Sequence, residues 1–186
     1  MTRPLRQDAA HRRENLLLTA ERVFARDGLD VPLHVIAEEA GVGRATLYRN
    51  FADRSELALA VFLKQIDELA ERTKAQLADP DAFVWFLEQM TALMLSSAGL
   101  SSAIRDLKDE ALAPIRQGLK KAGAEALAVS QAAGRIRGDL TAEDIRVIAL
   151  MLGAPARTVQ VNDRVALSQR SLELVLDAVR LRAAAQ

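Results

Sequence analysis

The sequence contains no cysteine and few aromatic residues, with one tryptophan, one tyrosine and five phenylalanines among its 186 residues. The lack of cysteine excludes disulfide bonds, a thiolate nucleophile and a cysteine-ligated zinc site. Glycine and proline are also scarce, at nine and five residues, whereas half of the chain is apolar. Because the apolar residues include many good helix formers and the two main helix breakers are rare, this composition favours an all-α protein.

Long apolar runs are missing as well. The only apolar stretch near the N-terminus is flanked and interrupted by charged residues, and no run elsewhere is long enough to span a bilayer. The pattern therefore predicts neither a signal peptide nor a membrane-spanning segment. We expect a cytoplasmic protein that has no membrane partner.

The chain also lacks an excess of charge of one sign, because 25 Lys and Arg residues offset 25 Asp and Glu residues. Its arginines nevertheless cluster in two places, which are Arg3, Arg6, Arg12 and Arg13 near the N-terminus and Arg44, Arg49 and Arg54 further along. A small positive patch on a neutral chain predicts modest non-specific affinity for nucleic acid and a shallow salt dependence. It does not exclude sequence-specific binding.

Patterns typical of catalysis or metal binding are absent. His11 and His34 are the only histidines, and neither stands near a second histidine or a carboxylate in a catalytic or ligand pattern. The segment 41–43, Gly-Val-Gly, is too short and too poorly placed to be a phosphate-binding loop. The sequence therefore predicts a protein that is not an enzyme and that uses no metal or other cofactor.

What the sequence does contain is a helix-turn-helix pattern over residues 33–51. The i, i+3, i+4, i+7 spacing of one helix face is met by Leu33, Ile36, Ala37 and Ala40. Gly41 follows, and glycine tolerates the left-handed backbone of a tight turn at a helix C-terminus. The pattern predicts a short helix, a glycine-centred turn and a second short helix.

The second predicted helix directs Leu47 and Phe51 inward, since they are four residues apart. The residues left facing outward are Arg44, Ala45, Thr46, Tyr48, Arg49 and Asn50. They provide two guanidinium groups, a hydroxyl, a phenol and an amide, with no acid among them. Such a surface suits a DNA groove, where phosphates and base edges accept hydrogen bonds.

This segment resembles the DNA-binding domain of TetR-family transcriptional regulators. The pattern Ile-Ala-x-x-Ala-Gly-Val-x-x-x-Thr-Leu-Tyr-x-x-Phe runs from Ile36 to Phe51. Residues 13–28 are similar to that family's first helix, and residues 51–57 are similar to the start of its fourth helix. The resemblance covers about the first third of the chain, and the remainder matches the family only in layout.

The resemblance implies double-stranded DNA as a partner and assigns roles to single residues. Base-edge contacts fall to Arg44, Ala45 and Arg49, phosphate contacts to Thr46, Tyr48 and Asn50, and a further cationic contact to Arg54. An arginine that bridges O6 and N7 of guanine contributes about 1–3 kcal/mol of discrimination. The family's usual capping hydroxyls are replaced here by Pro32 and Gly43, so phosphate anchoring should depend more on the other residues.

We predict two domains, a helix-turn-helix DNA-binding domain of three helices over residues 1–54 and a helical ligand-binding and dimerisation domain over residues 55–186, with about nine helices in all. The capping-box spacing from Asp53 to Glu56 predicts the start of the fourth helix. The serine-rich stretch 96–102 is predicted to be a polar break between helices.

The second predicted domain holds the candidate effector site. Large apolar residues cluster here at helical spacing. We expect a pocket for an unknown small molecule to be lined by Trp85, Phe86, Met90 and Met94, by Met151 from a later helix and by Asp106 as a polar group. Pockets of this kind are mostly apolar with a few polar groups. The alternative is that this stripe is simply the core of the domain.

The last two predicted helices are rich in apolar residues, which suits a four-helix interface in a homodimer. A two-fold dimer would present its two recognition helices roughly 34 Å apart, one DNA turn, and so match a palindromic operator. The resulting expectation is a ligand-responsive repressor that a small molecule releases from DNA. The alternative is a helical ligand-binding or protein-interaction module without sequence-specific DNA binding.

Overall fold

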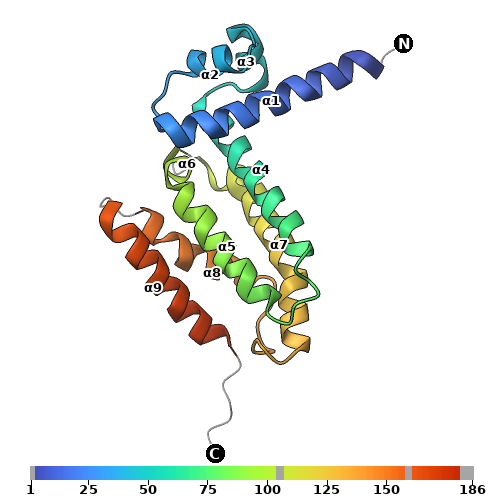
Figure 1. Cartoon of the computed structure of the whole chain (residues 1–186), viewed down its shortest axis with the longest axis vertical. Coiled ribbons are helices and arrows are strands. Elements are labelled where there is room, and N and C mark those ends of the chain that lie inside the picture. The colour runs from blue at the N-terminus through green and yellow to red at the C-terminus, as the bar shows by residue number, and fades with distance from the viewer. Residues whose placement is uncertain (1–2, 104–106, 158–160, 181–186) are drawn as a thin grey trace, which may run out of the picture. The chain divides into compact units, whose positions relative to one another are not determined.

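The computed structural model describes residues 3–103, 107–157 and 161–180 (Figure 1). These residues form helices, together with one isolated β-bridge between Ile136 and Arg180. The α-helices are α1 (Arg3–Asp27), α2 (Leu33–Glu39), α3 (Arg44–Asn50), α4 (Arg54–Lys74), α5 (Ala82–Ser96), α6 (Ala98–Ala103), α7 (Ala113–Ala132), α8 (Asp144–Gly153) and α9 (Val161–Val179), with short 3-10 helices at Asp109–Leu112 and Pro155–Arg157. The predicted all-α class is confirmed over the described part of the chain.

The chain divides into two compact units. The first comprises Met1–Phe62 and Gly99–Leu107, and the second comprises Leu63–Ala98 and Lys108–Gln186. The division therefore falls inside α4, whereas the sequence pattern places the domain boundary between residues 54 and 55. The reason is that α4 is continuous over its 21 residues, so its start marks a new helix but not the end of the first unit's packing.

The core of the first unit joins α1 to the helix-turn-helix. Leu16, Ala20 and Val23 of α1 are completely buried, as is Ile36 of α2. Gly41 ends α2 with a φ of +67°, and the Val42 N–H then donates to the Ala37 carbonyl at 2.9 Å. This is the left-handed turn expected from the sequence.

The start of α4 contains the predicted capping box. The Asp53 carboxylate accepts a hydrogen bond from the Glu56 N–H at 2.9 Å, and the Glu56 carboxylate accepts one from the Ala52 N–H at 2.6 Å. One unpaired donor of the first turn of α4, the Glu56 N–H, and the N–H of Ala52, which precedes the cap residue, are thereby satisfied. The position at which α4 begins is thus determined locally by this short segment.

The second unit is built around α5, which contacts α7, α8 and α9 (Figure 1). Phe83, Phe86 and Met90 are completely buried on α5, and the two phenylalanine rings stack with their centroids 5.9 Å apart. Gly123 of α7 lies against this stack, because a Cβ atom there would be 2.6 Å from Cε1 of Phe86. Glycine is therefore required for α7 to approach α5 this closely.

The predicted polar break at residues 96–102 is wrong, because α6 begins at Ala98 directly after α5 ends. Ser97 is buried rather than solvated, and its hydroxyl donates to the side-chain oxygen of Gln65 on α4 at 2.8 Å. A buried hydroxyl needs a partner, and here a residue distant in sequence provides it. No described helix is both long and apolar enough to cross a membrane.

Candidate nucleic-acid interface

The second helix of the helix-turn-helix, α3, is held to the first unit by its inward face. Leu47 and Phe51 are each only 1% exposed, which confirms their predicted inward direction. Gly43 is the N-cap residue in an extended conformation, and it makes no side-chain cap hydrogen bond. Because α3 has only seven residues, it depends on these buried anchors for its position.

The predicted DNA-facing residues lie on the opposite side of α3. Four of them are exposed: Arg44, Ala45, Tyr48 and Arg49. Their i, i+1, i+4 and i+5 positions place them on one face of the helix. Tyr48 is 54% exposed although it is a large aromatic residue. The structure therefore brings a phenol and two guanidinium groups together on an open surface.

Arginine and amide side chains of this helix already have partners within the protein. The Arg49 guanidinium donates to the Ala45 carbonyl at 3.1 Å and to the Thr46 hydroxyl at 3.2 Å. The Asn50 amide donates to the Thr46 carbonyl at 2.8 Å, and both Thr46 and Asn50 are half-buried. Arg44 pairs with the Glu38 carboxylate of α2, with Nη2 and Oε1 3.7 Å apart.

The last predicted DNA-binding residue, Arg54, has a different setting. Its guanidinium is half-buried at the start of α4 and donates to the carbonyls of Leu29 and Val31, the latter at 2.6 Å. Both carbonyls belong to the loop between α1 and α2. Arg54 thus ties this loop to α4, whereas the resemblance assigns it a contact with phosphate.

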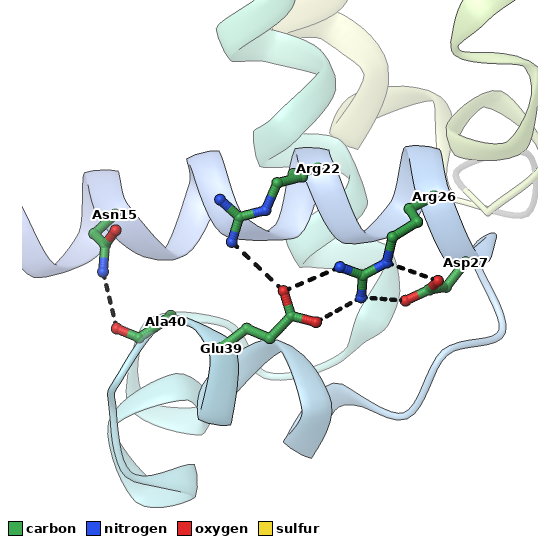
Figure 2. Close-up of polar contacts among 6 residues, drawn as sticks. All are labelled: Asn15, Arg22, Arg26, Asp27, Glu39 and Ala40. Carbon is green, nitrogen blue, oxygen red and sulfur yellow. Dashed lines mark hydrogen bonds and ion pairs between the residues drawn. The ribbon is translucent and has the colours of Figure 1, made fainter.

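A polar network joins α1 to α2 on the first unit's surface (Figure 2). The Glu39 carboxylate lies 2.5 Å from Nη2 of Arg26 and 3.5 Å from Nη2 of Arg22. Further along α1, the Asn15 amide donates to the Ala40 carbonyl at 2.8 Å. These contacts fix α2, and with it the turn that leads into α3.

The charges in this network support one another. Hydrogen bonds from Arg26 hold the pKa of Glu39 below its usual range, and Arg26 acts in the same way on Asp27. Both carboxylates therefore become protonated only at a lower pH than they would without these arginine contacts. The sequence pattern gives no sign of these partners, because the pairs lie 13 and 17 residues apart in the chain.

An arginine of α1 adds positive charge at the end of α3. The Cζ atom of Arg13 lies 5.1 Å from the centroid of the Phe51 ring. This is a cation–π distance, so the guanidinium is held next to the residue that ends the recognition helix. Arg13 belongs to the first of the two predicted arginine clusters, and the structure places it in the same unit as Arg44 and Arg49.

The predicted effector-binding residues that the structure describes differ in their exposure to solvent. Phe86 and Met90 are completely buried in the α5 core, Met94 is buried, and Trp85 is half-buried. Met151 is 51% exposed on α8, so it lies on the outer surface of this helix rather than on the core side with Phe86. Asp106 lies outside the described residues.

A hollow of about 150 Å³ lies between α4 and α7. Six of its ten lining residues are polar or charged, and the lining consists of Asp67, Ala70, Glu71, Thr73, Lys74, Leu77, Gly118, Lys121, Ala122 and Glu125. None of these is a predicted effector-binding residue. The hollow is also smaller than the roughly 300–1,000 Å³ typical of small-molecule sites.

The second unit also exposes large apolar residues on its last two helices. They are Val147, Leu150 and Met151 on α8, and Val165, Leu167 and Leu174 on α9, each at least 44% exposed. On α8 the i, i+3, i+4 spacing makes a continuous stripe. We refer to these six residues as the apolar stripe. Among the described residues, no group of three potential metal ligands is close enough to hold an ion.

Together, the fold and the exposed face of α3 define a helix-turn-helix protein with a separate helical second unit. Two family models match this arrangement: "Bacterial regulatory proteins, tetR family" over residues 16–61, and "Transcriptional regulator SbtR-like, C-terminal domain" over residues 79–181. The second covers more than half of the chain. The chain belongs to the TetR family of transcriptional regulators.

Related proteins support the same assignment. A TetR transcriptional regulator from Streptomyces coelicolor is 31% identical, with a TM-score of 0.66 over 92% of this chain and 99% of its own. A TetR regulatory protein from Mycobacterium vanbaalenii is 29% identical, with a TM-score of 0.63 over 96% and 100%. An HTH-type transcriptional regulator of Staphylococcus aureus is 34% identical over 64 residues, and this match spans about a third of each chain.

Proposed function

We propose that this protein is a homodimeric repressor, active in the cytoplasm, that binds a palindromic operator and releases it when a small molecule binds the second unit. The observation that carries the proposal is the exposed face of α3. Arg44, Tyr48 and Arg49 project from a short helix whose opposite face is anchored by buried residues. Cationic and phenolic donors on a rigid element suit contacts with base edges and phosphates.

The DNA part of the proposal is tested by selection from a pool of random duplexes, followed by shift assays on the selected sequence. We expect an inverted repeat and salt-sensitive binding. Arg44→Ala and Tyr48→Ala should each weaken binding at least about tenfold, because each removes a contact with the duplex. Arg72→Ala, an exposed arginine on α4, is the charge-matched control. Selection without enrichment would favour the rival function, a helical module that does not recognise DNA sequence.

The apolar stripe supports the dimeric part of the proposal. Exposed apolar residues on two neighbouring helices can form an isologous four-helix interface with a second copy. Leu150→Glu should yield monomers in analytical ultracentrifugation and abolish tight operator binding. Ala128→Glu, at an exposed position on α7, adds the same charge away from the stripe and should leave the dimer intact. A monomeric wild-type protein at micromolar concentration would contradict the proposal.

The match of residues 79–181 to the second domain of a regulator family supports effector binding in the second unit. Trp85 is the only tryptophan of the chain and is half-buried on α5. Its fluorescence can therefore be used to screen a small-molecule library for compounds that bind this unit. A true effector should change the fluorescence and also release the selected duplex. If compounds changed the fluorescence but never released the duplex, this would count against regulation by ligand.

A further inference from the structure

The two arginines on the exposed face of α3 have partners of different kinds. Arg49 folds back on its own helix and donates to the Ala45 carbonyl and the Thr46 hydroxyl, which are both neutral groups. Arg44, in the first position of α3, instead faces the Glu38 carboxylate of α2. One guanidinium therefore keeps its full charge toward solvent, whereas the charge of the other is offset by an acid.

Glu38 is the neighbour of Glu39 in the sequence, but the two carboxylates face different helices. Successive residues of an α-helix point about 100° apart. Glu39 turns toward Arg22 and Arg26 of α1, and its side chain is 29% exposed. Glu38 turns toward Arg44, and its side chain is 67% exposed. The first acid links helices within the fold, while the second lies open beside the recognition helix.

The Glu38–Arg44 pair has little to contribute to folding. Both side chains are about two-thirds exposed, and exposed ion pairs add little stability because water and salt screen them. The position of α3 is set instead by the buried Leu47 and Phe51. The pair's main effect is therefore on the charge at the start of α3.

An acid in this place distinguishes two kinds of DNA contact. A guanidinium has five N–H donors, and a bidentate contact with guanine O6 and N7 uses two of them. The guanidinium can make this contact while it stays paired with the Glu38 carboxylate, because the guanine edge carries no net charge. A phosphate is an anion, so a phosphate bound to Arg44 would be brought close to the Glu38 carboxylate and repelled by it.

We propose that Glu38 is a specificity-determining residue, which disfavours the binding of Arg44 to phosphate but leaves it able to contact a guanine edge. This inference rests on the proposed operator binding and deepens it. Non-specific affinity depends on the number of phosphates that cations neutralise. Glu38 therefore lowers affinity for arbitrary DNA while it leaves operator affinity in place, and a penalty on competing sites raises selectivity.

The test compares wild type and Glu38→Gln on two duplexes at several salt concentrations. One duplex is the sequence selected by the wild-type protein, and the other is a shuffled duplex of the same composition. We expect Glu38→Gln to bind the shuffled duplex about fivefold more tightly. The slope of the logarithm of its binding constant against the logarithm of the salt concentration should also be steeper by about one. Affinity for the selected duplex should stay within about twofold, so the selectivity ratio falls about fivefold.

Two controls separate an effect through Arg44 from simple repulsion. Glu88→Gln removes an exposed acid from α5 and changes the net charge equally, so it should leave the selectivity ratio unchanged. In an Arg44→Ala background, Glu38→Gln should no longer affect binding to the shuffled duplex. Measurements at about 50 mM salt keep this weaker binding observable.

Each outcome bears on the proposal. An unchanged ratio in Glu38→Gln would overturn it, and so would an equal effect of Glu88→Gln. An effect that persists in the Arg44→Ala background would assign Glu38 to general repulsion of DNA instead. These failures differ from failure of the proposed function, in which the wild-type protein itself would bind the selected and shuffled duplexes equally well.

Discussion

The two units hold their helices in place by different means. In the first unit, α2 and α3 have seven residues each, which is too short for a helix to be stable by itself. Directional contacts compensate, such as the bond from Asn15 to the Ala40 carbonyl and those from Arg54 to the α1–α2 loop. In the second unit, α5 and α7 are 15 and 20 residues long and pack through buried aromatic rings around Gly123.

This difference suits the tasks of the two regions. Hydrogen bonds and ion pairs depend on angle as well as distance, so they can fix the direction of α2, which leads through the turn into the recognition helix that Leu47 and Phe51 anchor. Apolar packing depends on shape and volume, and it gives most of the stability of a domain. Substitutions in the second unit should therefore cost the most folding free energy, while those in the first unit should cost less but alter DNA binding.

The largest effect is expected for Phe86→Ala. Removal of this fully buried ring leaves a cavity beside Gly123, which should lower the free energy of unfolding by about 3–5 kcal/mol. Urea denaturation at a fixed protein concentration measures the loss. Glu88→Ala, an exposed position on the same helix, should change stability by less than about 0.5 kcal/mol. A loss below about 1 kcal/mol for Phe86→Ala would mean that the core is not packed as described.

An intermediate loss of stability is expected for Arg54→Lys in the first unit. Because lysine keeps the positive charge, this variant separates the loss of hydrogen bonds from the loss of charge. Lysine cannot reproduce both hydrogen bonds to the Leu29 and Val31 carbonyls, so the free energy of unfolding should fall by about 1–2 kcal/mol. The salt dependence of operator binding should remain that of the wild type. If Arg54 acted only as a phosphate contact, this variant would retain its stability. Arg72→Lys on α4 is the matched control.

The smallest effect is expected for Glu39→Gln, which weakens the network in Figure 2. At neutral pH its melting temperature should be about 2 °C below that of the wild type. The pKa of Glu39 is lowered from its ordinary value of 4.5 in the folded protein. The carboxylate's contribution is therefore complete above that value and is lost as the pH falls below it.

Melting curves recorded from neutral to acidic pH check this sign. The gap between the melting temperatures of the two proteins should shrink as the pH falls below 4.5 and close once the wild-type Glu39 carboxylate is protonated. Glu14→Gln, which removes an exposed acid of α1, controls for the change in net charge. A gap between wild type and Glu39→Gln that widened on acidification would show that another titrating group is responsible.

Local patterns were sufficient to predict much of the first unit. The spacing of Leu47 and Phe51 predicts their burial, Gly41 predicts the left-handed turn, and Asp53 with Glu56 predicts the start of α4. Each of these depends on residues at most four positions apart, and the structure confirms each one. Short-range geometry is fixed by backbone sterics and helical periodicity, which the sequence displays directly.

Features that depend on distant residues were not predictable in the same way. Ser97 is buried because Gln65, 32 positions away, accepts its hydrogen bond. Arg54 reaches carbonyls 23 and 25 positions away. Met151 has the side chain expected of a pocket, but it lies on the outer face of α8. An apolar residue packs equally well into a core, a pocket or an interface, and composition does not distinguish these environments.

The placement of Gly41 has a consequence for redesign. Its left-handed backbone, with a φ of +67°, sets the bend between α2 and α3 without help from any exposed side chain. Arg44, Ala45 and Tyr48 are exposed, so libraries at these positions can be screened for new operators at little cost to folding. The chain thus offers a fixed scaffold with an interchangeable recognition surface, provided that the glycine is never varied.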